Sequence, residues 1–448
     1  MPPKSFNLLA KNKVLPFNKK IKVDSDKSIS IRSFLLGSIS QNITSVKNAL
    51  ESEDVLSTIN CLKQLGVKII KKKTGEYLVY GKGLGSMVAK KNATLNFGNS
   101  GTLARLLIGI LSSTPNIQIK IKGDSSLNKR SMKKLINLMS KFGASFLPKA
   151  KFNFPLKMIS SEMPIGFTYK AGVSAQLKSA VILAGLNSYG DTKVVEIKKS
   201  RDHTENMLLK NTNTIKITNG KKKIIQILGK KYLNNMQIKV PGDPSSAAFI
   251  VALTLLNKDS FIKIKNVGLN KTRIGFYQLL KSHGAKIKFS NLTKKNNERY
   301  GDIIVKTSEL KPIKASSEYY VKSTDEYPIL FIIASLIEGA SIFKGINDLA
   351  NKESNRISEM QKILKQIGIK STFSNDELKI FGKGMVVASD RKITVPNLGD
   401  HRICMSAFIL AILTGAFVKI KNFDTVYTSS PSFLKIMKSL GVKFEIQN

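Results

Sequence analysis

The 448-residue chain has little cysteine, little arginine and no long apolar run. Its two cysteines, Cys61 and Cys404, lie inside apolar helical patterns and are too few for a disulfide framework or a zinc site, so both are expected in the core. The apolar runs, such as 408–413, fall well short of the roughly 20 residues that a membrane span needs. The N-terminus lacks a continuous apolar stretch followed by a cleavage site, so no secretory signal is expected. These absences predict a globular, cytoplasmic protein.

Motifs for phosphoryl transfer and for nicotinamide binding are also missing. There is no GxxxxGK[ST] and no cluster of acidic residues suited to a metal. The GKGLGS at 81–86 is similar to a dinucleotide loop, but no helix pattern follows it. A related Gly-Lys pair recurs at 229–230 and 382–383, which indicates a repeated structural element instead. We therefore expect no cofactor and no metal.

The formal net charge of +43 raises the question of nucleic-acid binding. The positive charge is spread along the whole chain as Lys, which indicates a compositional bias rather than one basic stripe. No zinc finger, basic arm or aromatic-studded basic strand accompanies it. We expect no specific nucleic-acid partner, although an RNA-binding protein stays as an alternative of another class. A filter-binding signal that disappears at physiological salt would count against that alternative.

Arginine is used differently from lysine, because the chain has only nine Arg and most lie in or beside short polar motifs at helix starts. Arginine offers a rigid bidentate fork for a carboxylate or phosphate that lysine cannot imitate. The nine positions are 32, 105, 130, 201, 273, 299, 356, 391 and 402. This placement suggests anionic ligands.

An internal repeat runs through the chain as a Lys-rich helix end followed by Gly and an alternating strand. The six copies lie at 62–69, 138–146, 208–217, 279–287, 363–370 and 436–444, so one unit is about 75 residues long. Gly66, Gly143, Gly284, Gly368 and Gly441 should end their helices in the left-handed conformation. Asn213 stands at that place in the remaining copy and is expected to take the same role.

Each unit also contains an earlier helix that is apolar nearly all round and should be buried. These helices are expected at 26–39, 100–113, 174–186, 244–257, 324–339 and 400–415. Short strands such as 77–81, 224–229 and 377–382 lie between them. Because one core rarely grows beyond roughly 250–300 residues, six units predict an α/β protein with two domains of three units. The break is expected near 240–246, and a strand-like segment at about 4–24 fits either domain.

The starts of the buried helices are the expected binding positions, because helix N-termini present free N–H groups and a positive dipole end. Lys27, Ser28 and Arg32 crowd the first of them, and GNSGTLAR (98–105) gives a Gly-rich entry to the second. In the fifth unit, 324–326 places carboxylates at a helix start, and the sixth has Asp-His-Arg at 400–402. The second helices add Arg130, Arg201 and the set Lys352, Glu353 and Arg356. Plain helix capping explains any one of these motifs, but several cations among few acids indicate a site for multiply anionic substrates.

At these residues the sequence resembles the 5-enolpyruvylshikimate-3-phosphate synthase family over essentially the whole chain. The pieces that carry the resemblance are DKSISIR, GNSGTLAR, SAQ, GDPSSAAF, TDEYP, KESNR and GDHR, in the family's order and spacing. The resemblance implies a two-domain inside-out α/β barrel of the enolpyruvyl transferase type, with three repeated units in each domain. It implies one domain of 25–243 and another of 1–24 plus 244–448, which includes the N-terminal strand, with a hinge near 22–26 and 241–245 that lets the domains close over the substrates.

The resemblance implies transfer of the enolpyruvyl group of phosphoenolpyruvate to the 5-hydroxyl of shikimate 3-phosphate, in the shikimate pathway to chorismate and the aromatic amino acids. It implies a monomer, no cofactor, no membrane partner, and inhibition by glyphosate. Shikimate 3-phosphate is expected to contact Lys27, Ser28, Arg32, Ser174, Gln176, Ser200, Asp325 and Lys352. Phosphoenolpyruvate is expected to contact Lys27, Gly101, Arg130, Gln176, Arg356 and Arg402. Asp325 is the implied general base, and Glu353 with Lys27 is implied to protonate the vinyl methylene.

Three departures from the family pattern concern single contacts. Ala175 stands where some members have a second Ser, the loop 427–431 lacks a Lys that some members have, and 201–203 is a segment that differs among members. The nearest alternative within the fold is the cell-wall enzyme that transfers enolpyruvate to a UDP-amino sugar. That enzyme normally has a reactive Cys in a mobile loop, whereas the corresponding segment 123–132 contains none.

Overall fold

The computed structural model describes residues 5–385 and 388–447, so residues 1–4 of the expected domain segment 1–24 lie outside it. The chain divides into two compact units. Unit 1 comprises Met1–Asp24, Pro241–Lys294 and Arg299–Asn448, and unit 2 comprises Ser25–Val240 and Lys295–Glu298. The chain therefore passes between the units at 24/25 and 240/241, and the tip of one hairpin, 295–298, groups with unit 2.

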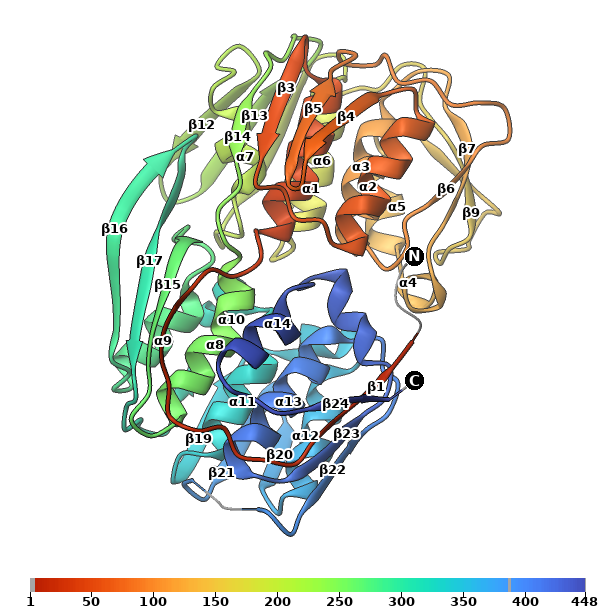
Figure 1. Ribbon diagram of the computed structural model, residues 1–448. Helices are drawn as coiled ribbons and strands as arrows, with labels where there is room; N and C mark the ends of the chain where they lie inside the picture. Colours follow the sequence, from red (N-terminus) through yellow and green to blue (C-terminus); the bar gives the residue numbers. More distant parts are fainter. Residues whose placement is uncertain (1–4, 386–387, 448) are drawn as a thin grey trace. The chain divides into compact units, whose positions relative to one another are not determined.

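Unit 2 contains three four-stranded sheets in its described residues, with helices packed inside them (Figure 1). The first sheet has the order β14 (Gln237–Lys239), β3 (Ile43–Lys47), β5 (Glu76–Tyr80), β4 (Lys68–Lys73). The second is β6 (Thr94–Asn96), β7 (Gln118–Lys122), β9 (Leu156–Ile159), β8 (Ser145–Leu147). The third is β10 (Thr168–Ala171), β11 (Asp191–Glu196), β13 (Lys223–Leu228), β12 (Ile215–Asn219). The central helices are α1 (Lys27–Ile39), α3 (Gly101–Ser112) and α6 (Ala175–Gly185), and the others are α2 (Glu53–Gln64), α4 (Ser125–Lys129), α5 (Lys133–Ser140) and α7 (His203–Leu208).

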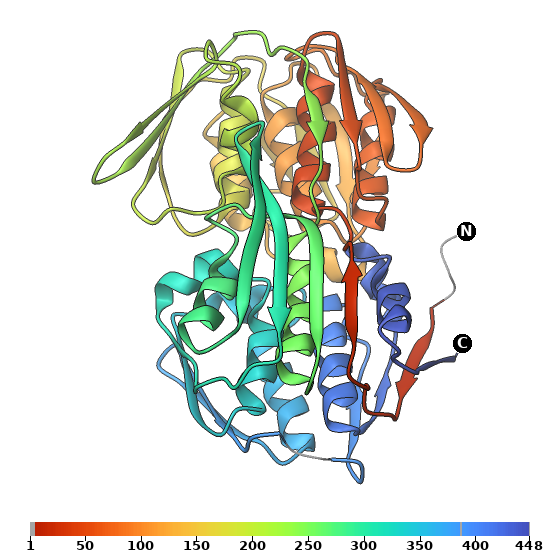
Figure 2. The same ribbon diagram turned by 60° about the vertical axis from the view of Figure 1, so that its left-hand side comes forward.

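Unit 1 repeats this plan with three further sheets (Figure 2). The first has the order β16 (Ile287–Lys295), β17 (Glu298–Lys306), β15 (Phe261–Gly268), β2 (Asn18–Ile21). The second is β18 (Lys314–Ala315), β19 (Gly339–Lys344), β21 (Glu377–Gly382), β20 (Lys370–Ser374). The third is β22 (Lys392–Val395), β23 (Phe417–Ile420), β1 (Asn7–Ala10), β24 (Glu445–Gln447). The central helices are α8 (Pro244–Leu256), α11 (Tyr327–Ser335) and α13 (His401–Thr414). The others are α9 (Gly275–Ser282), α10 (Ser317–Ser323), α12 (Arg356–Gln366), α14 (Phe433–Ser439) and the 3₁₀ helices η1 (Asn347–Asn351) and η2 (Phe423–Thr428).

All six sheets share one pairing scheme, in which a parallel edge pair is followed by an antiparallel neighbour. In four of them the parallel pair belongs to one crossover through a central helix, as in β6-α3-β7. In the other two the edge strand comes from elsewhere in the chain: β2 precedes α1 but pairs with β15, and β14 precedes α8 but pairs with β3. The sixfold repeat that the sequence predicts is therefore present, with two edge strands exchanged.

The N-terminal segment belongs to unit 1 by its pairing. Strand β1 lies antiparallel between β23 and β24, with Leu8 opposite Ile420 and Ile446. Strand β2 runs parallel to β15, with Ile21 opposite Ile264. Each of the two strands thus completes a different sheet.

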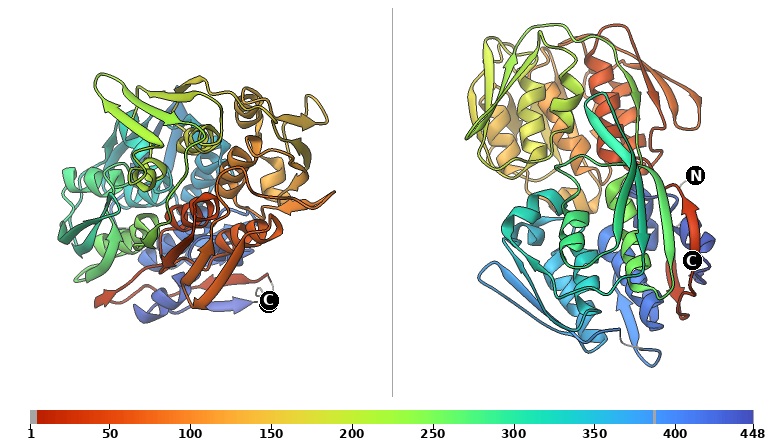
Figure 3. Two further views of the ribbon diagram at one scale, coloured as in Figure 1. Left: turned by 90° about the horizontal axis from the view of Figure 1, so that it is seen from above. Right: turned by 90° about the vertical axis from the view of Figure 1, so that its left-hand side faces the viewer.

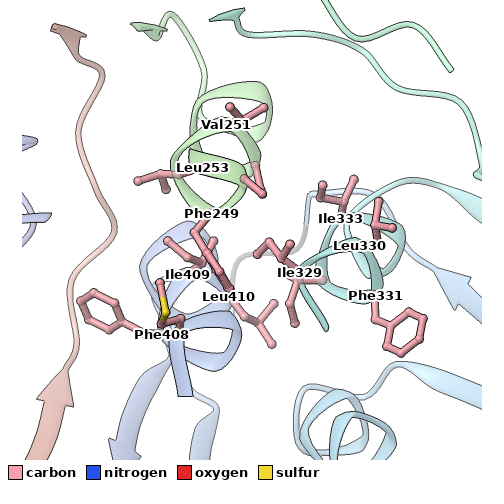
Figure 4. Close-up of a cluster of buried hydrophobic side chains, with 14 of the residues drawn as sticks. Phe249, Val251, Leu253, Ile329, Leu330, Phe331, Ile333, Phe408, Ile409 and Leu410 are labelled. Carbon is pink, nitrogen blue, oxygen red and sulfur yellow. The ribbon is translucent and has the colours of Figure 1, made fainter. Parts of the chain in front are cut away.

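The six central helices form the cores, as their apolar sequences predict. In unit 1, α8, α11 and α13 pack against one another, and fully buried side chains such as Phe249, Ile329 and Leu410 lie on them (Figure 4). The equivalent helices of unit 2 lie inside its sheets, as the view from above shows (Figure 3). Burying one such side chain contributes roughly 1.5–3 kcal/mol, so each of these helices stabilises the fold substantially. The two cysteines are buried and free, which confirms the prediction for both.

The repeated glycines behave as predicted, with one exception. Gly66, Gly143, Gly284, Gly368 and Gly441 have φ values of 81°, 95°, 99°, 74° and 84°. The prediction for Asn213 was wrong, because Asn213 does not take the left-handed conformation. Helix α7 ends instead in two successive turns, closed by hydrogen bonds from the Asn211 and Thr214 N–H groups to the carbonyls of Leu208 and Asn211. These turns reverse the chain without a positive φ.

The recurring Gly-Lys pairs close the C-terminal ends of central helices. A Cβ at Gly81, Gly229 or Gly382 would lie 2.1, 2.0 or 1.9 Å from a carbonyl oxygen at such an end, so only glycine fits. The N–H groups of the lysines that follow donate to carbonyls of the same helix ends, at 2.9, 3.0 and 3.4 Å. GKGLGS is therefore part of the repeat and not a dinucleotide loop.

Candidate functional site

The candidate residues of unit 2 gather at the N-terminal ends of its central helices. Lys27 and Gly101 are the first residues of α1 and α3, and Gln176 is the second residue of α6. The three helix caps are Asp26, Ser100 and Ser174. Their side chains accept hydrogen bonds from backbone N–H groups at 2.8, 3.2 and 3.4 Å. Each cap satisfies one N–H group, while the positive ends of the helix dipoles stay available to an anion.

Lys27 is held by a buried carboxylate. Its Nζ donates to Oδ2 of Asp54 at 2.8 Å, and Asp54 is 5% exposed. Asp54 lies in the first turn of α2, where a negative charge is also favoured by the helix dipole. The contact fixes the ammonium group at the start of α1.

Arg32 is buried and its guanidinium is held from three directions. Its Nε donates to Oγ1 of Thr204 at 2.9 Å, its Nη2 to Oγ of Ser179 at 3.2 Å, and its Nη1 to the carbonyl of Ser28 at 3.0 Å. The two hydroxyl groups lie 2.8 Å apart and bridge α6 to α7. Ser28 itself is half-buried in the first turn of α1, so it lies beside the arginine as the i, i+4 spacing predicts.

Gln176 is oriented by two residues of α3. Its Oε1 accepts from Nη1 of Arg105 at 2.8 Å, and its Nε2 donates to Oγ1 of Thr102 at 2.9 Å. These contacts settle which end of the amide faces which neighbour, since only the oxygen can accept from a guanidinium. Arg105 thus holds Gln176, a residue expected to bind both substrates.

Gly101 and Arg130 lie close together at the start of α3. A Cβ at Gly101 would be 3.3 Å from Nη1 of Arg130 and 2.7 Å from Nη1 of Arg105. Arg130 ends the short helix α4, and its Nη2 donates to Oδ1 of Asn99 and Oγ of Ser126 at 2.8 and 3.1 Å. Two guanidinium groups therefore lie beside the backbone where α3 begins.

Ser200 and Ser174 differ in how they are placed. Ser174 is half-buried at the N-cap of α6, whereas Ser200 is 1% exposed. Both the N–H and the hydroxyl of Ser200 donate to Oε1 of Glu196, at 3.1 and 2.7 Å. In this conformation the hydroxyl of Ser200 is engaged within the protein.

Arg356 is the centre of the candidate residues in unit 1. It is 1% exposed, and its Nε donates to Oδ2 of Asp400 at 2.9 Å. Its Nη2 donates to Oε2 of Glu353 at 2.6 Å, and its Nη1 lies 3.9 Å from Oδ1 of Asp325. Burial opposes the charge of this guanidinium, but Asp400, Glu353 and Asp325 together hold the pKa of Arg356 above its ordinary value. One buried cation therefore joins three acidic groups.

Asp325 and the residues near Arg356 lie at helix ends rather than inside helices. The helix expected from residue 324 begins at Tyr327, because 324–326 form the turn after α10 and Pro328 occupies the first turn of α11. Arg356 is the first residue of α12, as expected, whereas Lys352 and Glu353 precede the helix and were wrongly expected within it. Nζ of Lys352 contacts Oδ2 of Asp348, and the hydroxyl of Tyr320 donates to the same oxygen at 2.7 Å.

Arg402 lies in the first turn of α13 and is 5% exposed. Its backbone N–H donates to Oδ1 of Asp400 at 3.0 Å, so one aspartate both caps α13 and binds Arg356. Its guanidinium carbon lies 5.9 Å from the ring centre of Phe249. Among the residues that the structure describes, none accepts a hydrogen bond from the buried Nε of Arg402. An N–H donor of this kind is suited to an incoming anion.

The structure thus brings the predicted residues together in two groups, one in each unit. Several supporting partners were missed, among them Asp54, Arg105, Ser179, Thr204 and Asp348. Arg105 carried a usable signal, since it is one of only nine arginines and completes GNSGTLAR. Within 5–385 and 388–447, no three His, Cys, Asp or Glu side chains are grouped so as to hold a metal ion. No helix in the described part of the chain is both long and apolar enough to cross a membrane.

Comparison with solved structures defines the class first. The fold is shared with the enolpyruvyl transferase NikO from Streptomyces tendae, at a TM-score of 0.75 with 12% identity over 99% of each chain. It is also shared with EPSP synthase from Acinetobacter baumannii, at a TM-score of 0.84 with 33% identity over 99% of this chain and 100% of that one. The architecture is therefore of the enolpyruvyl transferase type, as the resemblance implies.

The sequence comparisons narrow the class to one family. The family model for EPSP synthase (3-phosphoshikimate 1-carboxyvinyltransferase) matches residues 11–437. Proteins named 3-phosphoshikimate 1-carboxyvinyltransferase are similar over nearly their full lengths: one from Paramagnetospirillum magneticum is 35% identical over 98% of both chains, and one from Bacillus subtilis is 36% identical over 97% of this chain and 100% of its own. The chain belongs to the EPSP synthase family.

Proposed function

We propose that this protein transfers the enolpyruvyl group of phosphoenolpyruvate to the 5-hydroxyl of shikimate 3-phosphate and releases phosphate. The observation that carries the proposal is the buried Arg356, which joins Asp400, Glu353 and Asp325 in a chain that belongs to this family. This arrangement places a cation for an anionic substrate beside the carboxylates that proton transfer requires.

Shikimate 3-phosphate is the proposed ligand of Lys27, Ser28, Arg32, Ser174, Gln176, Ser200, Asp325 and Lys352. Arg32 suits a phosphate or carboxylate because its guanidinium is held in one orientation by Thr204 and Ser179. For Ser200 the proposal requires a change, since its hydroxyl would have to leave Glu196 in order to donate to the ligand. A bound phosphate must therefore compete with a buried carboxylate for that hydrogen bond.

Phosphoenolpyruvate is the proposed ligand of Lys27, Gly101, Arg130, Gln176, Arg356 and Arg402. Its carboxylate and phosphate match the bidentate geometry of guanidinium groups. The backbone at Gly101 permits close approach, because glycine has no side chain of its own there and the guanidinium groups of Arg105 and Arg130 lie beside it. The buried Nε of Arg402 supplies a further donor.

The proposed reaction is an addition followed by an elimination. Asp325 takes the proton of the 5-hydroxyl as the hydroxyl oxygen attacks C2 of phosphoenolpyruvate, while Glu353, with Lys27 as its partner, delivers a proton to the vinyl methylene carbon. The resulting tetrahedral intermediate then loses a proton from that carbon and its C–O bond to phosphate breaks, which restores the double bond. Positioned acid and base groups each contribute about 10²–10⁴-fold to such steps.

The test is to incubate the purified protein with both substrates in chelator and to measure phosphate release. We expect release only when both substrates are present. A UDP-amino sugar in place of shikimate 3-phosphate should give none, which separates this activity from the cell-wall reaction. Failure to release phosphate from the correct pair would contradict the proposal.

We propose a monomer that works in the cytoplasm without a cofactor, a membrane partner or a specific nucleic-acid partner. We also propose two domains, 25–243 and 1–24 with 244–448, joined by a hinge near 22–26 and 241–245. Sedimentation at low micromolar concentration tests the monomer, and the chelator in the assay tests the absence of a required metal.

A further inference from the structure

Four buried charged residues, called the quartet below, lie in unit 2 and are not among the residues predicted to bind substrate. Nζ of Lys178 lies 2.8 Å from Oε1 of Glu196 and 2.7 Å from Oε1 of Glu205. Nζ of Lys223 lies 3.5 Å from Oε2 of Glu196 and 3.2 Å from Oε1 of Glu205. The four residues come from α6, β11, α7 and β13, so the quartet ties together two helices and two strands.

The quartet is almost completely removed from water. None of the four side chains is more than 9% exposed: Lys178, Glu196, Glu205 and Lys223. Burial opposes ionisation of Glu196, yet Lys178 and the donors of Ser200 hold its pKa below the ordinary value. Burial likewise opposes the charge of Lys223, while Glu205 and Glu196 raise its pKa. The two positive and two negative charges therefore balance inside the protein.

The quartet adjoins the residues that hold Arg32. Lys178 is followed in α6 by Ser179, and Glu205 is preceded in α7 by Thr204. Ser179 and Thr204 are the two hydroxyl residues that accept hydrogen bonds from Arg32. The ion pair and the hydroxyl pair thus join the same two helices at adjacent positions in the sequence.

We propose that Lys178 and Glu205 are positioning residues for Arg32, because their buried ion pair fixes α6 against α7 and so sets the two hydroxyls that orient the guanidinium. The inference rests on the proposed function, in which Arg32 binds shikimate 3-phosphate. Burying four charges is a costly way to hold two helices together, since apolar side chains of similar volume usually stabilise a fold as well. A requirement for orientation accounts for the ionic contact, which fixes direction and distance as well as proximity.

The test uses a variant that keeps the net charge of the quartet unchanged. Lys178→Met with Glu205→Gln removes one positive and one negative charge and leaves the pair formed by Glu196 and Lys223, so no unpaired charge is buried. Because Arg32 is proposed to bind substrate in the ground state and transition state alike, its misorientation should act on KM for shikimate 3-phosphate. We expect that KM to rise about tenfold or more, with kcat and the KM for phosphoenolpyruvate at saturating shikimate 3-phosphate changed by less than about threefold.

Two further variants separate positioning from loss of stability. Leu183→Ala removes a buried side chain from the same helix without touching the quartet, and should lower Tm while leaving both KM values unchanged. Thr204→Val removes an acceptor of Arg32 and should reproduce the rise in KM for shikimate 3-phosphate. Hydrogen exchange in α7, followed by mass spectrometry, should be faster in the double variant and unchanged in the Leu183 variant.

The outcomes distinguish this inference from the proposed function. An active wild type, with an unchanged KM for shikimate 3-phosphate in the folded double variant, overturns the positioning role of Lys178 and Glu205 and leaves the function standing. An equal rise in both KM values, or a fall in kcat alone, also overturns it. A wild type that releases no phosphate from the two substrates overturns both.

Discussion

Gly101 lies against the guanidinium of Arg105. A Cβ at Gly101 would be 2.7 Å from Nη1 of Arg105, a distance that real contacts essentially never show. The same Nη1 donates to the carbonyl of Gly101 and to Oε1 of Gln176, at 3.0 and 2.8 Å. A methyl group at this position therefore displaces Arg105, and through it the amide of Gln176, in addition to crowding any ligand beside the backbone.

Gly101→Ala is expected to raise KM for phosphoenolpyruvate and to weaken inhibition by glyphosate, which we predict to be competitive with that substrate. The measurement is the inhibition constant for glyphosate in the phosphate-release assay. To show that Arg105 transmits part of the effect, the substitution is repeated in an Arg105→Lys background. A smaller effect there indicates coupling, whereas identical effects in both backgrounds would show that the methyl acts on the ligand alone.

Asp325→Asn is expected to lower kcat by about 10²–10⁴-fold without loss of folding, because Asn keeps the shape of Asp but cannot take a proton. The carboxylate is 27% exposed and lies at 3.9 Å from Arg356, so its removal leaves the stronger contacts of that arginine intact. Asp390→Asn, at an exposed position, is the control and should be fully active. Near-normal turnover of the Asp325 variant would make Glu353 the first candidate for the base.

Asp400→Asn is expected to destabilise unit 1 by about 3 kcal/mol, because it leaves the buried Arg356 without its main charged partner. The free energy of unfolding is measured by urea titration. Asp348→Asn is the matched control, since Asp348 pairs with a lysine but is 49% exposed, and should cost less than about 1 kcal/mol. An equal decrease in the free energy of unfolding in the two variants would show that burial of the ion pair does not determine its contribution to stability.

Glu51→Gln is expected to show a pH-dependent effect on stability. Glu51 accepts hydrogen bonds from Lys71 Nζ, the Gly75 N–H and the Tyr77 hydroxyl, at 2.7, 2.8 and 2.8 Å. Burial opposes its ionisation, but these donors lower the pKa of Glu51 below 4.5. A carboxylate with a lowered pKa contributes stability above its unfolded pKa and loses it as the pH falls through the folded value. The wild type should exceed the variant by about 1 kcal/mol at pH 7, and the difference should shrink below about pH 4.5. A constant difference would show that the charge of Glu51 is not involved.

The two cysteines are expected to resist thiol reagents in the native protein. Burial raises the pKa of Cys61 to about 12 and also raises that of Cys404, so little thiolate forms at pH 8. A colorimetric thiol titration should find almost no fast reaction in buffer and two equivalents in denaturant. Rapid reaction of either thiol in buffer would mean that its helix opens readily.

The repeat, the buried helices and the left-handed glycines could be predicted because each leaves a local periodic trace in the sequence. The predictions for Asn213 and for the start of α11 were wrong for the same reason, because both relied on a local pattern alone. Such a pattern does not show that two successive turns follow α7, or that 324–326 form a turn after α10. The pairs that organise the candidate site join distant positions, as in Arg32 with Thr204, 172 residues away. No spacing rule connects such residues, and only the packing of α6 and α7 brings them together.

Strand β1 pairs with strands that are synthesised much later than β1 itself. Residues 7–10 are made before unit 2, yet their neighbours in the sheet, β23 and β24, are made after it. Residues 25–240 are complete long before then and can form their own core while the first strands still wait. The sheet that contains β1 therefore closes only after β23 and β24 have been made, and pairings of such long sequence separation form slowly.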